Sequence, residues 1–348
     1  MKEKKINPWR ITIDTNPDSC NLNCIMCEDH SGYAEPQRER KRKGTQRLNM
    51  TKELLERAVR ESAEMGVTEL IPSTMGEPLL YRHFDLILDL CKELSLKINL
   101  TTNGTFPSPD KEKNVEYWAK RIIPIGSDVK ISWNGATAKT QEQIMPRSSF
   151  TQHIDNTKRF IAVRDQVAKE TNNYCKMTMQ LTFLETNVAE IPAMIEMAIE
   201  LGFDRVKGHH LWAHFEDIKS LSLRKDSKSI VLWNETVRLC HEIADKHNNI
   251  SEHKIVLENF FVLDPTQIEN IAQEGECPFL GKEMWIAPNG RFNVCCAPDQ
   301  ERKKLGDFGN LKQNSLEEIW HSAKYQHLCD NYMEKPLCLS CNMRRPKN

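Results

Sequence analysis

Strand-like and helix-like segments alternate six times between residues 9 and 212, and no other feature of the sequence constrains the fold as strongly. The predicted strands are Arg10–Asp14, Thr68–Ser73, Lys97–Thr102, Asp128–Trp133, Lys176–Leu184 and Arg205–Leu211. Helical patterns lie between them at Thr51–Met65, Phe84–Leu94, Phe150–Glu170 and Ala189–Leu201. Repeated β-α units predict an α/β fold with a parallel sheet and outer helices, as either an open doubly wound sheet or a partial barrel. Functional residues are then expected at the C-terminal ends of the strands.

Beyond residue 212 the β-α alternation stops, which predicts a three-part organisation. Residues 1–212 form the α/β domain, and residues 213–274 form a connecting segment with one helix near Ser229–Lys246. Residues 275–348 hold six of the twelve cysteines among Gly, Pro and Asn residues, with little regular periodicity. Because such a stretch buries little core by itself, we predict a small domain stapled by metal.

The overall charge and hydropathy of the chain do not point to a particular class of binding partner. The formal net charge is -1, so no polyanion or membrane surface is required as a partner. No apolar run is long enough to span a bilayer, and the basic start MKEKKINPWR lacks the apolar core of a signal peptide. We therefore expect a cytoplasmic protein, in which twelve cysteines indicate metal sites rather than a disulfide framework. The basic stretch Gln37–Arg47 is interpreted as a solvated loop, with an anion contact as the alternative.

The first cysteines, Cys20, Cys24 and Cys27, follow directly after the first predicted strand. Three thiolates in so short a segment converge only if the chain forms a compact loop, which the two asparagines between them suit. A [4Fe–4S] cluster usually has four cysteine ligands, so a set of three would leave one iron open to an outside molecule. The alternative is a zinc site with His30 as fourth ligand, although structural zinc more often takes paired C-x2-C ligands.

The spacing Cys20-x3-Cys24-x2-Cys27 resembles the signature of the radical S-adenosylmethionine (SAM) superfamily. The resemblance implies a partial (β/α)6 TIM-like barrel and a [4Fe–4S] cluster whose open iron binds the amino and carboxylate groups of SAM. It also implies reductive cleavage of SAM to methionine and a 5′-deoxyadenosyl radical, which removes hydrogen from the substrate while the protein positions the cofactor. Met26 stands where the family often has an aromatic residue beside the adenine, and a thioether can pack against an aromatic ring.

Further motifs of that family are matched in order at the ends of consecutive predicted strands. Met75-Gly76-Glu77-Pro78 resembles the GGEP motif, Thr102-Asn103-Gly104 the TNG segment, and Ile131–Gly135 the ISLDG-type segment. Taken alone, the first of these is equally a strand-to-helix turn. By the resemblance, Glu77 and neighbouring backbone receive the SAM amino group, and Ser132 and Asn134 contact its carboxylate or ribose. Arg147 pairs with the carboxylate, for which a guanidinium is suited, with a surface role as the alternative. The implied SAM-binding residues are Met26, Gly76, Glu77, Pro78, Asn103, Ser132, Asn134 and Arg147.

The C-terminal cysteines resemble a second cluster-binding pattern. Cys277-x12-Gly-x4-Cys295, together with Cys338-x2-Cys341, is similar to the SPASM/twitch extension of a subset of radical SAM enzymes. The similarity implies an auxiliary [4Fe–4S] cluster with these four cysteines as ligands, which suits electron transfer. The alternative is a four-cysteine zinc ribbon. The segment around Asn289-Gly290 predicts a hairpin turn. Cys296 and Cys329 are interpreted as packed thiols, and the alternatives for Cys296 are to replace Cys295 as ligand or to donate a hydrogen atom.

The resemblance defines the chemistry more closely than the substrate. The cysteine spacing is similar to that of the dehydrogenase of butirosin biosynthesis, which implies hydrogen abstraction from a small, sugar-like molecule and its oxidation through the auxiliary cluster. The alternatives are a peptide-modifying enzyme that forms thioethers, a redox-neutral epimerase or, from another class, a zinc-binding nucleic-acid module. An external electron donor such as flavodoxin or ferredoxin is implied. A membrane is not expected as a partner, nor is nucleic acid, because no aromatics are interleaved with the basic stretch.

Candidate catalytic residues follow from their position at strand ends. His209, His210 and His214 lie near the end of the sixth predicted strand, and Glu185 follows the fifth. A histidine there could act as a base that removes a substrate proton. The alternative for each histidine is a packed, hydrogen-bonded structural role.

Overall fold

The structure is a computed structural model, which describes residues 7–72, 75–107, 112–266, 268, 275–341 and 343–344. Ser73, at the end of the second predicted strand, and the ends of the predicted domains at 1–6, 269–274 and 345–348 lie outside the described residues. The chain forms two compact units. The first comprises Met1–Ser19, Arg47–Asn99 and Asn270–Asn348, and the second comprises Cys20–Gln46 and Leu100–Glu269.

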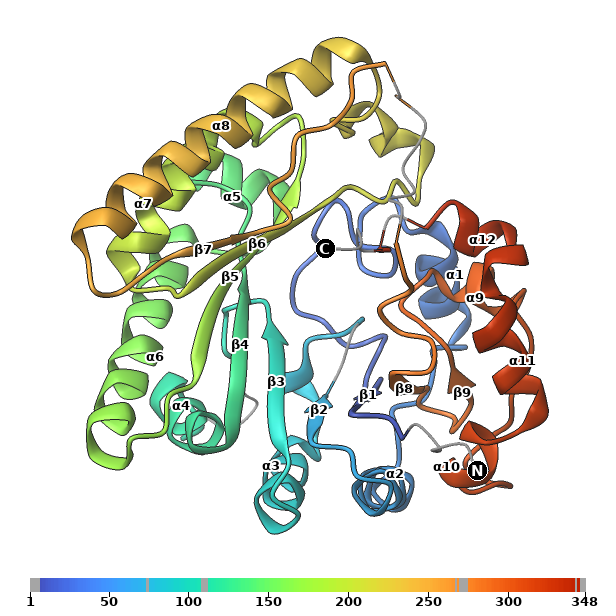
Figure 1. The fold of residues 1–348 in the computed structure, drawn as a ribbon. Helices are drawn as coiled ribbons and strands as arrows, with labels where there is room; N and C mark the ends of the chain where they lie inside the picture. Colours follow the sequence, from blue (N-terminus) through green and yellow to red (C-terminus); the bar gives the residue numbers. More distant parts are fainter. Residues whose placement is uncertain are drawn as a thin grey trace, which may run out of the picture. The chain divides into compact units, whose positions relative to one another are not determined.

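Parallel strands form the centre of the first unit (Figure 1). β1 (Arg10–Ile13) pairs in parallel with β2 (Glu69–Ile71) on one side and with β8 (Glu283–Ile286) on the other. β2 also pairs with the start of β3 (Lys97–Thr102), and β8 turns back into β9 (Phe292–Asn293). The predicted hairpin is therefore confirmed, but the sequence did not predict that its first strand joins β1. The helices here are α2 (Lys52–Glu64), α3 (Phe84–Glu93), α9 (Asp299–Lys303), α10 (Leu316–Trp320), α11 (Ala323–Asn331) and α12 (Pro336–Leu339).

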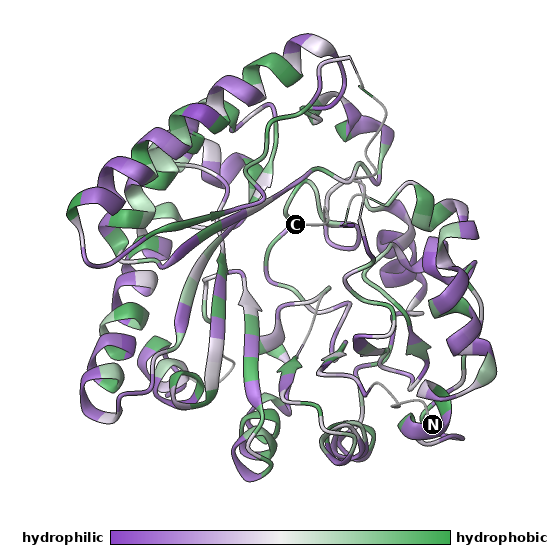
Figure 2. Cartoon of the chain, in the orientation of Figure 1, coloured by the Kyte–Doolittle hydropathy of each residue, from purple (hydrophilic) through white to green (hydrophobic). Residues whose placement is uncertain are grey.

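Four strands of the second unit lie in the parallel order β4-β5-β6-β7. They are β4 (Gly126–Ser132), β5 (Lys176–Phe183), β6 (Arg205–His210) and β7 (Val256–Glu258). The helices of this unit are α1 (Glu35–Lys43), α4 (Val115–Ile122), α5 (Ala138–Ile144), α6 (Phe150–Thr171), α7 (Ile191–Leu201) and α8 (Ser227–Ile250). Figure 1 shows α6, α7 and α8 on the same side of these strands, and Figure 2 shows that these helices mix hydrophobic and hydrophilic residues. The sequence did not predict strand β7 within the connecting segment, because three residues are too few to show the alternation of polar and apolar side chains that marks a strand.

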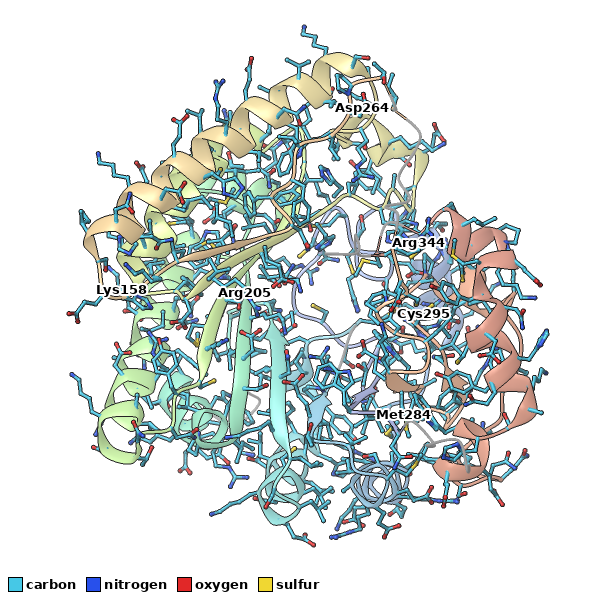
Figure 3. All side chains as sticks on the ribbon, viewed as in Figure 1. Lys158, Arg205, Asp264, Met284, Cys295 and Arg344 are labelled. Carbon is cyan, nitrogen blue, oxygen red and sulfur yellow. The ribbon has the colours of Figure 1, made fainter. Side chains whose placement is uncertain are left out.

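Side chains alternate along the strands of the second unit, so one face is apolar and the other polar. Val129, Ile131, Met177 and Met179 are fully buried. On the opposite face an ion-pair network joins three strands: the Arg205 guanidinium (Figure 3) pairs with Asp128 of β4 and with Glu258 of β7, and Lys207 also pairs with Glu258. Polar side chains near the ends of these strands can therefore be accommodated on this charged face.

The predicted β-α alternation is confirmed, and its capping residues act as expected. The Thr51 hydroxyl accepts a hydrogen bond from the Leu54 backbone at 3.3 Å at the start of α2. Gly202 ends α7 in the left-handed conformation with φ of 85°. The predicted helix Ala189–Leu201 differs only in its first turn, which is 3-10 (Val188–Glu190).

The prediction of a loop at the basic stretch Gln37–Arg47 is wrong, because most of this stretch belongs to the helix α1. Most of its basic side chains are paired: Arg38 and Arg42 with Glu35, Lys43 with Glu39, Arg40 with Asp29 at 3.1 Å, and Arg47 with Asp18 at 2.5 Å. Pairs three or four residues apart on a helix stabilise it, so a run of like charge becomes helical once acidic partners alternate with it. Asp29 lies two residues from Cys27, so α1 also anchors the cysteine loop.

The C-terminal part of the first unit buries more core than its composition predicts. Trp320, Tyr325 and Phe292 are almost fully buried, and the rings of Trp320 and Phe292 lie 5.0 and 5.3 Å from the ring of Tyr325. Aromatic pairs at such distances add packing energy beyond the area they bury. Among the helices that the structure describes, none is both long and apolar enough to cross a membrane.

Candidate active site

The loop that carries Cys20, Cys24 and Cys27 belongs to the second unit and directs backbone N–H groups toward sulfur. The Leu22 N–H donates to Cys20 Sγ at 3.5 Å, and the His30 N–H donates to Cys27 Sγ at 3.3 Å. Such bonds stabilise negative charge on sulfur and are among the interactions that tune iron–sulfur clusters. Three thiols with amide donors around them therefore fit an iron–sulfur cluster.

Apolar packing surrounds this loop. Cys20, Cys24 and Met26 contact a buried cluster of Leu22, Ile144, Met145, Leu184, Leu211 and Ile218. Burial, with a smaller contribution from the Asp29 charge, raises the pKa of Cys27 to about 11. A metal ion bound at such a site deprotonates its thiol ligands outright, so this pKa describes the thiol without metal. The surroundings favour a site from which water is largely excluded.

His30, the alternative fourth ligand, is buried and oriented toward α1. Its Nδ1 lies 3.3 Å from the Gln37 amide nitrogen, and its exposed fraction is 3%. This hydrogen bond occupies one of the two ring nitrogens that a metal could bind.

The predicted Gly76–Pro78 motif forms a tight turn in the first unit. Glu77 N–H donates to the Ser19 carbonyl at 2.8 Å, and the Asn16 amide donates to the Glu77 carbonyl at 2.8 Å. The Glu77 carboxylate is buried and accepts from the Leu79 N–H at 3.3 Å, so it caps the 3-10 turn Pro78–Leu80. Backbone groups of this turn are thereby held against the segment that leads into Cys20.

Replacing Gly76 by alanine is expected to disrupt this turn. The new Cβ would lie 2.1 Å from the Asn16 oxygen and 2.7 Å from the Ser19 oxygen, both backbone atoms that cannot rotate away. We expect a loss of about 1–3 kcal/mol in stability, as for other overpacked sites, and weaker SAM binding. Thermal unfolding and equilibrium dialysis with SAM measure the two effects.

Gly32→Ala is the matched control, since no heavy atom lies within 4 Å of a Cβ at that position. A Gly76→Ala protein with the melting temperature and SAM affinity of the unmodified chain would contradict this account of the turn.

Residues at the end of β4 serve mainly to join strands. Ser132 is half-buried at the last position of β4. Asn134 is buried, its side-chain oxygen accepts from the Thr182 N–H at 2.9 Å, and its carbonyl accepts from the Asn187 amide at 3.1 Å. The Asn134 side chain therefore fastens the end of β4 to the end of β5.

A cavity of about 220 Å³ lies beside the cysteine loop in the second unit. It is lined by Asn21, Gly104, Thr105, Pro107, Arg147, Ser149, Gln152, His153 and Asn156. Arg147 is exposed and has a φ of 75°, an uncommon conformation for a residue other than glycine. The described residues that line the cavity include this one cation and no carboxylate, so the cavity suits an anionic group.

His153 forms part of the cavity wall and is 1% exposed. The ring packs edge-on against Trp133, with the ring centroids 4.3 Å apart. Burial lowers the pKa of His153 to about 4, against a smaller opposing effect of the Ser132 backbone. The imidazole is therefore neutral at neutral pH.

His153 should make the protein less stable as pH falls. Its folded-state pKa of about 4 lies below the ordinary value of 6.5, so the unfolded chain binds the proton first and stability declines from pH 6.5 downward. We expect a loss of about 1 kcal/mol between about pH 7.5 and 5.5 from this group. Urea unfolding at several pH values measures it. In His153→Gln this part of the pH dependence should disappear, and an unchanged slope would contradict the assignment.

The candidate catalytic residues face different surroundings. His209 is an exposed residue on the polar face of the strands, and its ring nitrogens lie 3.4 Å from the Gln180 amide and from the Thr182 hydroxyl. Desolvation of the ring, with a smaller contribution from the Lys207 charge, lowers its pKa to about 4. His210 points to the opposite face, between the rings of Phe183 and Trp233, where burial holds its pKa well below 6.5. Glu185 forms an ion pair with Lys225. Of these residues, His209 alone joins solvent access to the polar strand face.

His214, noted in the sequence near the same strand end, stacks with Trp212 at 6.4 Å. Burial lowers its pKa, and the charge of Asp29 acts in the opposite direction.

The four predicted auxiliary ligands gather in the first unit. Burial is the largest cause that raises the pKa values of Cys277, Cys295 and Cys338, and charges within the set raise them further: Cys341 acts on all three, and Cys277 acts on Cys295 and Cys338. Backbone N–H groups donate to Cys277 Sγ and to Cys341 Sγ, each at 3.4 Å. Figure 3 labels one of the four, Cys295.

No three His, Cys, Asp or Glu side chains meet at single-ion distances in the part of the chain that the structure describes. Both cysteine sets consist of thiols, the ligand type that holds iron–sulfur clusters.

Two tyrosines that sequence reasoning missed support this set. The Tyr332 hydroxyl accepts from the Cys277 N–H at 3.2 Å, and the Tyr325 hydroxyl accepts from the Gly281 N–H at 3.1 Å. Tyr325 also forms a hydrogen bond with Cys329, whose pKa burial raises to about 11. Cys296 is adjacent to Cys295 in sequence, and burial holds its pKa well above 9.0. Nothing in the sequence near either tyrosine signals these contacts.

Comparison with known protein families matches two parts of the chain. A family described as the radical SAM superfamily matches residues 17–171, and SPASM, described as an iron–sulfur cluster-binding domain, matches residues 277–342. The matched ranges contain the two cysteine sets described above.

Two curated relatives indicate the range of chemistry among similar proteins. The chain is 22% identical over 297 residues to the PqqA peptide cyclase of Methylobacterium nodulans, covering 83% of this chain and 69% of the relative. It is 19% identical over 346 residues to the tungsten-containing aldehyde ferredoxin oxidoreductase cofactor-modifying protein of Pyrococcus furiosus, covering 93% and 85% respectively.

Solved structures share the fold. Streptococcus suis SuiB bound to its precursor peptide SuiA matches with a TM-score of 0.66 and 19% identity, over 97% of this chain and 70% of that chain. The protein anSMEcpe with bound AdoMet matches with a TM-score of 0.64 and 14% identity, over 96% and 88%. These similarities confirm the predicted fold class, a partial α/β barrel with a small C-terminal domain.

Proposed function

Because this chain is a radical SAM enzyme with a C-terminal SPASM domain, we propose that it modifies a peptide at a C–H bond in a net oxidation. The two domains imply [4Fe–4S] clusters and SAM as cofactors. The observation that carries the proposal is the pair of separate cysteine sets, three thiols in the loop of the second unit and four gathered in the first. Bound together, SAM and a reduced cluster supply a 5′-deoxyadenosyl radical that takes a hydrogen atom from substrate.

The residues of this chain then have distinct proposed roles. Cys20, Cys24 and Cys27 hold the cluster that binds SAM, and their apolar surroundings exclude water from it. Arg147, in the cavity that suits an anion, pairs with the SAM carboxylate. In the first unit, Cys277, Cys295, Cys338 and Cys341 hold the auxiliary cluster, which would accept an electron.

A peptide substrate is favoured over the small molecule that the cysteine spacing implied. Relatives named for peptide cyclisation match over 83% of this chain, and SuiB, which shares the fold, was solved with a precursor peptide. On the polar face of the second unit, His209, Gln180 and Thr182 offer groups that can bind peptide backbone. We propose that His209 contacts the substrate there.

Oxidation of a small alcohol is the second candidate function. An auxiliary cluster with four thiol ligands could accept an electron from an alcohol substrate as well as from a peptide. Epimerisation is redox-neutral and needs no electron acceptor. A second cluster held by the four thiols therefore favours an oxidation over an epimerisation.

Anaerobic reconstitution followed by product analysis tests the proposal. We expect about eight irons per chain, from two four-iron clusters, and formation of 5′-deoxyadenosine from SAM and dithionite. A candidate precursor peptide should lose two hydrogen atoms by mass, and deuterium placed at the modified carbon should appear in 5′-deoxyadenosine. Intact SAM would overturn the radical SAM chemistry. Oxidation of small alcohols without any change in peptides would overturn the peptide assignment alone.

A further inference from the structure

The side-chain amide of Asn103 lies against the cysteine loop, although 83 residues separate it from Cys20. Its Nδ2 lies 3.8 Å from Cys20 Sγ and donates to the Asn21 side-chain oxygen at 2.8 Å. Asn103 follows the end of β3 and is 8% exposed, so this contact is shielded from solvent. The resemblance had assigned Asn103 to SAM, whereas its amide here approaches a thiol.

A ring of three side chains fixes which end of the amide faces sulfur. The Thr105 hydroxyl and N–H both donate to Asn103 Oδ1, at 2.6 and 3.0 Å. The same hydroxyl accepts from the Asn21 amide at 2.9 Å, and Asn21 in turn accepts from Asn103. Because Oδ1 is occupied by two donors, Nδ2 must face Cys20, and the orientation of this amide follows from the network.

From this geometry we propose that Asn103 raises the reduction potential of the cluster held by Cys20, Cys24 and Cys27. Reduction adds negative charge to the cluster, part of which resides on its sulfur ligands, and an N–H dipole aimed at sulfur stabilises the reduced form more than the oxidised form. The inference rests on the proposed function, since it requires that these thiols hold such a cluster. Asn103 is a positioning residue that acts through Cys20.

This role explains why a polar residue is buried next to the turn Gly104–Thr105. A buried amide is costly unless its donors and acceptor are paired, and the ring pairs them. The backbone N–H of Leu22 donates to the same sulfur, so Asn103 adds a second donor that a different side chain would remove.

Redox titration of the full, reconstituted chain tests the proposal. The cluster is reduced with dithionite at controlled potentials without SAM, and it is followed by the electron paramagnetic resonance signal that later addition of SAM perturbs. In Asn103→Leu, which keeps a similar volume but has no N–H, the ratio of reduced to oxidised cluster at the unmodified midpoint should fall about threefold to tenfold. A tenfold change in this ratio corresponds to about 59 mV for a one-electron couple.

Three further variants distinguish the effect of the Asn103 amide on the reduction potential from the effect of a less tightly held loop. Thr105→Val keeps the amide but removes a donor that orients it, so a smaller fall in the same direction is expected. Asn103→Asp replaces the donor by a charged acceptor of the same shape, so a larger fall is expected. The Asn156 amide holds the same turn through the carbonyls of Gly104 and Thr105, at 3.1 and 3.4 Å, and Asn156→Leu should leave the potential unchanged.

An unmodified midpoint in Asn103→Leu with full iron content would overturn the proposal. So would a shift in Asn156→Leu as large as that in Asn103→Leu, because loosening of the turn would then explain both. Failure of the unmodified chain to bind iron would instead overturn the proposed function, and iron content distinguishes the two failures. If Asn103→Leu does not assemble, Asn103→Asp and Thr105→Val carry the test.

Discussion

Replacing Cys24 by alanine is expected to reduce 5′-deoxyadenosine formation by at least about 1000-fold, because loss of the cofactor removes most of the rate enhancement it supplies. Two remaining thiols cannot hold a cluster that already lacks a fourth protein ligand. Iron content should therefore fall to about four per chain, the amount in the auxiliary cluster. Iron analysis and chromatography of the nucleoside products measure both outcomes.

Cys91→Ala provides the matched control for loss of a thiol. Cys91 is fully buried in α3, and burial raises its pKa to about 12, as expected for a packed thiol. Its replacement should leave the iron content and SAM cleavage unchanged. Loss of iron from this variant, or its retention in Cys24→Ala, would show that the loop does not hold the cluster.

Replacing both Cys338 and Cys341 by alanine is expected to separate the two halves of the reaction. SAM cleavage should stay within about threefold of the unmodified rate, while formation of oxidised peptide should fall at least about 100-fold. The physical reason is that the substrate radical then lacks its electron acceptor, whereas the cluster that cleaves SAM keeps all of its ligands. Parallel assays of 5′-deoxyadenosine and of product mass give the two rates.

Cys329→Ala is the control for this pair, because its thiol lies near the set but has Tyr325 as its partner. It should retain about eight irons per chain and form product. Undiminished product in the Cys338→Ala/Cys341→Ala protein would refute an electron outlet at this site and would favour redox-neutral chemistry.

The two units differ in how they hold their thiols. In the second unit the three proposed ligands come from one short loop. The Arg40–Asp29 ion pair holds this loop, as do backbone hydrogen bonds from Asn23 and Ile25 to Pro146 and Ile144. In the first unit the four proposed ligands come from distant segments, and tyrosine hydroxyls hold the chain around Cys277. The cysteine loop of the second unit is therefore fixed to other segments by side-chain and backbone contacts.

Local signals in the sequence were sufficient for most of the regular elements between residues 9 and 212. Strand and helix periodicity, the Thr51 cap and the Gly202 cap depend on neighbours within a few residues, and the structure confirms them. The basic stretch was wrong as a loop because ion pairs three and four residues apart outweigh its like charges. The sequence could not predict which of His209 and His210 lies on the polar face of the sheet. Adjacent residues of a strand point to opposite faces, and only the packing of the other elements decides which face is covered.

The sequence by itself indicated the radical SAM and SPASM families, because cysteine spacing within a short loop and within a paired motif is a local property of the chain. The tertiary structure alone decided the surroundings of those cysteines: β8 beside β1, Tyr332 against Cys277, and the Asn103 amide against Cys20. These contacts join residues tens to hundreds of positions apart. Their energies arise only when folding excludes water from both partners, and no pattern along the chain records that exclusion.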